Sequence, residues 1–147
     1  MKIALASDHG GFELKEIIKD YLQINGHEVK DFGTSSLESV DYFDYSVKAA
    51  EAVSKGEVER GIVMCGTGIG VSISANKVKG IRCALCHDVY SAEMTRAHNN
   101  SNMLAMGGRV IGRDLAVRIV KAWLEFDFEG GRHLRRINKI SDYENQC

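Results

Sequence analysis

The residue with the clearest chemical potential is Cys65, which opens a glycine-rich loop. The segment reads Cys65-Gly66-Thr67-Gly68-Ile69-Gly70 and directly follows the apolar run 61–64. Glycines allow backbone N–H groups to turn toward a ligand, and a helix starting after the loop would favour negative charge there. The same field would favour the thiolate form of Cys65. From spacing alone, a tight strand–helix turn with an inert cysteine stays open as an alternative.

Other uses of such a loop fit less well. Its glycines do not form the full G-x-G-x-x-G dinucleotide fingerprint, and no Gly-Lys-Ser/Thr follows as in a phosphate-binding Walker A loop. A cysteine phosphatase would need an arginine shortly after its nucleophile, where Val71 and Ser72 stand. A thiol that acts as a base toward carbon therefore fits best.

Two histidine segments are further candidates. Asp8 and His9 follow the first apolar run and could bind sugar hydroxyls or phosphate, although such a pair is more often a cap or a solvated turn. His98 and Asn99 lie where a helix gives way to a strand. His98 could act as an acid or base near neutral pH, or the segment could only cap the helix.

A basic segment near the end of the chain is the candidate phosphate anchor. Arg132 and Arg136 are four residues apart, so on a helix they share one face. Two guanidinium groups aimed together suit a phosphate monoester. A solvated basic tail is the plainer alternative.

Short apolar runs alternate with amphipathic segments along the chain, which predicts the elements that must position these residues. We expect strands at 3–6, 27–32, 61–64, 81–86 and 102–106, and helices at 14–22, 47–53, 71–77, from 88 onward, 115–124 and 130–140. Such alternation predicts one domain over residues 1–147. Its fold class is α/β: three layers, a doubly wound, mainly parallel five-stranded Rossmann-like sheet, and a C-terminal helical tail. Ligands of such sheets bind at the carboxyl ends of the strands, where Asp8, Cys65 and Gly107-Gly108-Arg109 all fall.

Composition excludes several classes of protein. The 147 residues carry a net charge of -1, so nothing attracts nucleic acid or an acidic membrane surface, and no apolar stretch is long enough for a signal peptide or a membrane span. We therefore expect a cytoplasmic protein with reduced thiols. Cys83-Ala84-Leu85-Cys86-His87 matches a haem-attachment pattern, but a buried strand with two inert cysteines on opposite faces is favoured. No zinc-like spacing is present, and we expect neither a metal nor a cofactor.

Taken together, these segments resemble the ribose-5-phosphate isomerase B family over essentially the whole chain. The resemblance rests on five segments in one order: Ala6-Ser7-Asp8-His9-Gly10-Gly11-Phe12, Asp31-Phe32-Gly33-Thr34, Cys65 to Gly70, His98-Asn99-Asn100-Ser101-Asn102, and Gly130-Gly131-Arg132-His133 through Arg136. One departure is Phe43, where family members often carry proline.

The resemblance implies an aldose–ketose isomerase that interconverts ribose 5-phosphate and ribulose 5-phosphate, a step of the non-oxidative pentose phosphate pathway. It implies that Cys65 moves the proton between C1 and C2, and that His98 opens the furanose ring. Further roles are implied for residues of the loops and the tail: Thr67 and the amides of Gly66, Gly68, Ile69 and Gly70 for the enediolate; Asp8, His9 and Asn99 for the sugar; and Arg109, Arg132 and Arg136 for the ligand or its phosphate. It also implies a homodimer or higher homo-oligomer with the site at the subunit boundary.

Two alternatives stay open. A related isomerase would act on galactose 6-phosphate or allose 6-phosphate, although relatives specific for galactose 6-phosphate tend to lack the His-Asn-Asn and Gly-Gly-Arg-His segments found here. A non-catalytic sugar-phosphate sensor would keep the phosphate anchors, but it would have no need of Cys65, Thr67 and His98 together.

Overall fold

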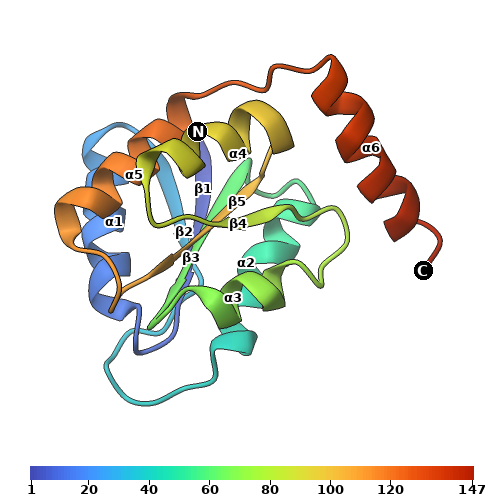
Figure 1. The fold of residues 1–147 in the computed structure, drawn as a ribbon. Helices are drawn as coiled ribbons and strands as arrows, with labels where there is room; N and C mark the ends of the chain where they lie inside the picture. Colours follow the sequence, from blue (N-terminus) through green and yellow to red (C-terminus); the bar gives the residue numbers. More distant parts are fainter.

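A five-stranded sheet forms the centre of the molecule, with all neighbouring strands parallel (Figure 1). The computed structural model describes residues 1–147 and orders the strands β2-β1-β3-β5-β4. In chain order, the elements are β1 (Lys2–Ser7), α1 (Phe12–Ile24), β2 (Glu28–Asp31), α2 (Tyr42–Ser54), β3 (Arg60–Cys65), α3 (Ile69–Ala75), β4 (Cys83–Leu85), α4 (Val89–Asn99), β5 (Met103–Gly107), α5 (Arg113–Glu125) and α6 (Arg132–Glu144). The predicted α/β class, strand number and helical C-terminus are confirmed.

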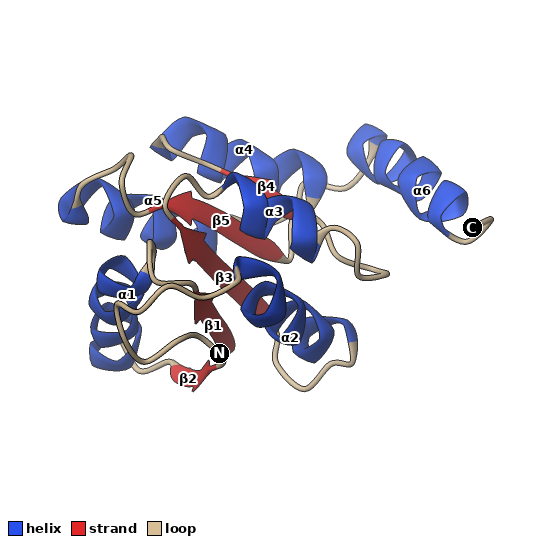
Figure 2. Ribbon diagram, turned by 90° about the horizontal axis from the view of Figure 1, so that it is seen from below, coloured by secondary structure: helices blue, strands red, loops and turns tan.

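Helices cover both faces of the sheet, which gives the three predicted layers (Figure 2). Side chains alternate between the faces because successive residues of a strand point to opposite sides. Ile62 and Met64 of β3 pack in the core beneath α1 and α5, whereas Val63 and Cys65 pack beneath α2 and α3. The side chain of Cys65 therefore lies on the face that α2 and α3 cover.

The strand β4 is shorter than predicted, and side-chain amides bond the residues at its start. Asn76 bonds Cys83 through both groups of its amide, donating to the carbonyl O at 2.9 Å and accepting from N–H at 2.8 Å. Asn102 accepts from the Arg82 N–H at 2.8 Å. Cys83 and Cys86 pack in the cores on opposite faces of the sheet, as predicted. Burial raises the pKa of Cys83 to about 12 and that of Cys86 to about 11, so both thiols are inert near neutral pH.

The last helix, α6, stands away from the sheet at one side of the molecule (Figure 1). Its buried residues are His133 and Ile137, and it packs against α4. The remainder of α6 is exposed or half-buried, including Arg132 and Arg136. Because the rest of the chain covers little of α6, most of the surface of this helix is open to contact with other molecules.

Candidate active site

Three turns meet at the carboxyl ends of β1, β3 and β5. The turn after β5 is bonded to the turn after β3, since Gly108 N–H donates to the Cys65 carbonyl at 2.8 Å and Arg109 N–H to the Gly66 carbonyl at 3.0 Å. The turn after β1 packs against the same loop, because a Cβ added at Gly10 would lie 2.8 Å from the Gly66 amide nitrogen. The predicted convergence at this edge of the sheet is confirmed.

The sulfur of Cys65 lies at the centre of these turns. Cys65 is 5% exposed, and its Sγ accepts a hydrogen bond from the Gly68 N–H at 3.1 Å. Gly68 has φ 78°, a left-handed conformation that glycine adopts at no steric cost. A donor on the sulfur stabilises its anionic form. Thr67 is exposed beside it, and its Oγ1 accepts from the Ile69 N–H at 3.3 Å.

The turn after β1 is held by the side chain of Asp8. Its Oδ1 accepts from the N–H groups of Gly10 and Gly11 at 2.9 and 3.1 Å, and Asp8 is 6% exposed. The Asp8 side chain therefore closes the turn itself, whereas the N-cap residue of α1 is Gly11, which makes no side-chain capping bond. The neighbouring His9 accepts the Val40 N–H on its Nδ1 at 3.1 Å, which links this turn to the loop after β2.

A small cavity opens between the turns. It has a volume of about 210 Å³, and its lining includes His9, Glu13, Leu37, Gly108 and Arg109. The side chain of Arg109 is exposed and lies over the cysteine loop, with its Nη1 3.1 Å from where a Cβ on Gly66 would be. The cavity therefore brings the imidazole of His9 and the guanidinium group of Arg109 together beside the cysteine loop, with the carboxylate of Glu13 also in its lining.

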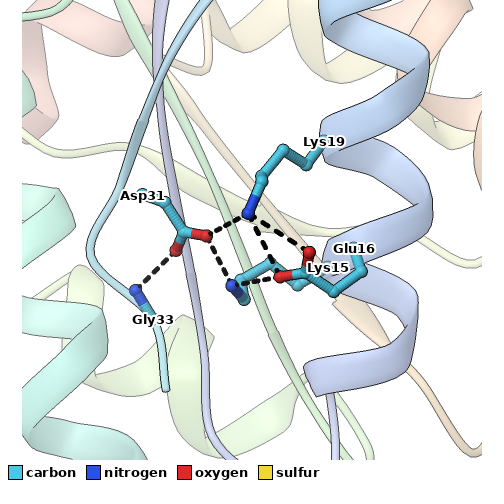
Figure 3. Close-up of polar contacts among 5 residues, drawn as sticks. All are labelled: Lys15, Glu16, Lys19, Asp31 and Gly33. Atoms are coloured by element: carbon cyan, nitrogen blue, oxygen red, sulfur yellow. Dashed lines mark hydrogen bonds and ion pairs between the residues drawn. The ribbon is translucent and has the colours of Figure 1, made fainter. Parts of the chain in front are cut away.

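A cluster of ion pairs lies where the loop after β2 begins (Figure 3). This is the loop that carries Val40. Lys15 is 1% exposed and pairs with Asp31 and with Glu16, and Lys19 pairs with the same two carboxylates. Asp31 also accepts the Gly33 N–H at 2.9 Å, which fixes the turn after β2. Burial alone would raise the pKa of Asp31, but the hydrogen bonds from Lys15, Gly33 and Lys19 outweigh it and hold this pKa below its ordinary value. The carboxylate thus stays ionised and the loop stays anchored.

One residue that supports the site, His87, could not be recognised from its residue type or spacing. Its Nε2 accepts the Gly107 N–H at 3.0 Å, at the end of β5 beside the cysteine loop. His87 therefore holds the strand end that supports the turn at Gly108. The only sequence signal was its place after an apolar run, because the bond joins residues 20 positions apart.

The other predicted site residues do not lie near Cys65 of the same chain. His98 and Asn99 end α4, a few residues before Asn102, whose carbonyl accepts the Gly61 N–H near the start of β3 at 3.0 Å. Cys65 lies four residues beyond Gly61, or about 13 Å along the strand at roughly 3.3 Å per residue. His98 and Asn99 therefore lie near the opposite edge of the sheet from Cys65.

Arginine side chains lie at this edge of the sheet, one of them bonded to the end of α4 and two of them on α6. Arg82 bonds the carbonyls of Asn99 and Asn100 at 2.9 to 3.2 Å and so closes the end of α4, where a cation is favoured. Asn100 has φ 47° and caps the helix, as one alternative for this segment predicted. The exposed Arg132 and Arg136 belong to α6, which packs on α4 beside His98.

Three donor groups at this edge come close enough to suggest a metal ion. Atoms of His98, Glu129 and His133 lie within 4.8 Å of one another. The two imidazole rings are stacked, however, with centroids 4.2 Å apart and planes 11° apart. Ring lone pairs lie in the ring plane, so two nearly parallel rings cannot both point at one ion unless one of them turns. This arrangement fits ring stacking better than metal coordination.

Comparison with known proteins assigns this combination of fold and site to a class. Residues 3–140 match the family model described as Ribose/Galactose Isomerase. The chain is 56% identical to ribose-5-phosphate isomerase B of Clostridium thermocellum, with 99% of each chain covered and a TM-score of 0.98. This chain therefore belongs to the ribose/galactose isomerase family of sugar-phosphate isomerases.

Two further relatives bear on the substrate. The D-erythrulose-4-phosphate isomerase of Pectobacterium atrosepticum is 46% identical, covering 99% of this chain and 97% of the relative. The ribose-5-phosphate isomerase B of Mycoplasma genitalium, a structure with bound ribulose 5-phosphate, is 40% identical, with 99% and 97% covered and a TM-score of 0.96. The predicted family is confirmed.

No helix of this chain is both long and apolar enough to cross a membrane.

Proposed function

We propose that this chain interconverts D-ribose 5-phosphate and D-ribulose 5-phosphate through an enediolate. The observation that carries the proposal is the Cys65 sulfur, which the Gly68 N–H holds at 3.1 Å in a turn of glycines beside a small cavity. The family and the ribulose 5-phosphate bound by the Mycoplasma genitalium relative support it. The reaction would belong to the non-oxidative pentose phosphate pathway in the cytoplasm, where the thiol stays reduced.

The proposed chemistry is a pair of proton transfers. The Cys65 thiolate removes the proton from C2 of the open-chain aldose, and the electron pair moves through C1 onto O1. A second proton passes from O2 to O1, and the thiol of Cys65 then returns its proton to C1, which leaves a ketone at C2. Thr67 and the loop amides stabilise the negative oxygen, a contribution of about 3 kcal/mol for one such donor.

The complete site requires a second copy of the chain. His98, assigned to ring opening, and the phosphate anchors Arg132 and Arg136 belong to α4 and α6, at the edge of the sheet opposite Cys65. In a two-fold dimer, the His98 edge of one chain can contact the Cys65 edge of the other chain. The symmetry then forms the same contact a second time with the two chains exchanged. The exposed surface of α6 is available for this contact.

The anchor assignment predicts a selective loss of substrate affinity. Replacing Arg132 or Arg136 with alanine should raise KM for ribose 5-phosphate by about 10-fold or more with a smaller change in kcat, because a charge-assisted bond to the phosphate is equal in ground and transition states. Arg135→Ala is the matched control, since this exposed arginine lies on the same helix without an assigned role. Unchanged KM in both test variants would remove the anchor assignment.

The substrate itself is tested by comparing kcat/KM for four sugar phosphates. Ribose 5-phosphate should give the highest value, ahead of allose 6-phosphate and galactose 6-phosphate. D-erythrose 4-phosphate is included because the Pectobacterium atrosepticum relative is named for the matching ketose. A higher value for one of the other sugars would reassign the substrate, and no turnover of any of them would favour a sugar-phosphate sensor.

A further inference from the structure

His133 is the one polar residue that α6 buries. It is 6% exposed on a helix whose other buried residue is Ile137. Its Nε2 is buried without a hydrogen bond and lies 3.3 Å from a carboxylate oxygen of Glu129. The contact that defines its position is instead made by the ring face, which stacks on His98 at 4.2 Å between centroids.

The ring of His98 depends on this stack for its orientation. His98 is half-buried near the end of α4, and its side chain makes no hydrogen bond or ion pair within the chain. A single flat neighbour at 4.2 Å and 11° restricts the tilt of the imidazole but leaves its nitrogen atoms free. Stacked aromatic pairs stabilise such arrangements beyond the area that they bury.

The charge state of His133 suits this contact. Burial lowers the pKa of His133, the neighbouring His98, Arg132 and Arg136 lower it further, and Glu129 opposes them. The ring is therefore neutral near pH 7. A neutral ring tolerates a proton on His98, whereas two cationic rings at this distance would repel each other.

We propose that His133 is a positioning residue, whose flat ring holds the His98 imidazole at the angle needed to open the furanose ring. The inference rests on the proposed function, in which His98 acts on cyclic ribose 5-phosphate. Misplacing a reacting group by about 1 Å can cost on the order of 10²-fold in rate. His133 therefore influences ring opening without touching the substrate.

A purely structural role makes a different prediction. If His133 only anchored α6, its loss would displace Arg132 and Arg136 as well, and every reaction of the sugar phosphate would suffer equally. A positioning role instead affects only the step that needs His98. Ribulose 5-phosphate separates the two, because its O5 carries the phosphate and it cannot close a furanose ring.

The test compares His133→Phe, which keeps a flat ring, with His133→Leu, which keeps the apolar volume without one. We expect His133→Leu to lower kcat for ribose 5-phosphate by about 10-fold with little change in KM, whereas His133→Phe recovers most of the activity. Exchange of the C1 hydrogen of ribulose 5-phosphate into solvent should stay within about 3-fold of wild type in both variants. His133→Met replaces the leucine variant if that one does not fold.

Two results would overturn the inference. Equal kcat in the leucine and phenylalanine variants would show that the flat ring is not needed. Equal loss of isomerisation and of exchange would show that His133 only anchors α6. Failure of the proposed function is distinguishable, because the wild type itself would then neither isomerise ribose 5-phosphate nor exchange the hydrogen of ribulose 5-phosphate.

Discussion

Replacing Cys65 with alanine is expected to abolish isomerisation of ribose 5-phosphate while leaving the sugar phosphate bound. The loss should be at least about 10²–10⁴-fold in kcat, because a positioned general base contributes that much and no step can proceed without removal of a carbon-bound proton. The dissociation constant, measured by calorimetry, should change little, since the proposed phosphate anchors Arg132 and Arg136 are untouched.

The remaining cysteines provide the control. Cys83 and Cys86 have pKa values raised to about 12 and about 11 by burial, so iodoacetamide at neutral pH should leave them unmodified. Cys147 is exposed, and Cys147→Ser should keep full activity. Alkylation should inactivate this variant, and saturating ribose 5-phosphate should slow the loss. If Cys65→Ala keeps near-wild-type turnover, the base is a different group, and Thr67 or Asp8 is the next candidate.

Replacing His98 with asparagine should separate ring opening from proton transfer. Isomerisation of ribose 5-phosphate, whose dominant form is cyclic, should fall by about 10²-fold, in line with the usual contribution of a general acid–base group. Exchange of the C1 hydrogen from bound ribulose 5-phosphate into solvent should fall much less, because this acyclic ketose needs only Cys65 and the enediolate donors. Exchange and isomerisation lost to the same extent would assign His98 a different role.

The part of the site at the carboxyl ends of the strands could be predicted from the sequence. Asp8, Cys65 and Arg109 each follow an apolar run, and the carboxyl ends of parallel strands gather at one edge whatever the order of the strands. These features depend on neighbours in the chain, which is why the spacing of residue types revealed them.

Long-range pairings could not be predicted in the same way. The bonds from Lys15 to Asp31 and from Gly107 to His87 join residues 16 and 20 positions apart, and no periodicity reports them. The bond at the start of β4 is of the same kind, since Asn102 accepts the Arg82 N–H from 20 positions away.

The separation of His98 from Cys65 has a similar cause. The sequence places His98 where a helix gives way to a strand, but only the parallel sheet shows that this junction lies near the opposite edge from the cysteine loop. Helices in such folds run back across the sheet, so the end of α4 returns toward the start of the strands. The proposal that a site using both residues combines two chains therefore rests on this topology and not on residue types.

The most direct test of this account mixes two inactive chains, Cys65→Ala and His98→Asn, under conditions where mass spectrometry shows that subunits exchange. In a mixed dimer, one site carries both substitutions and the other carries neither. Half of the dimers in an equimolar mixture are mixed, so the account predicts recovery of about one quarter of wild-type turnover of ribose 5-phosphate. Mixed dimers with no more activity than the separate variants would contradict the account.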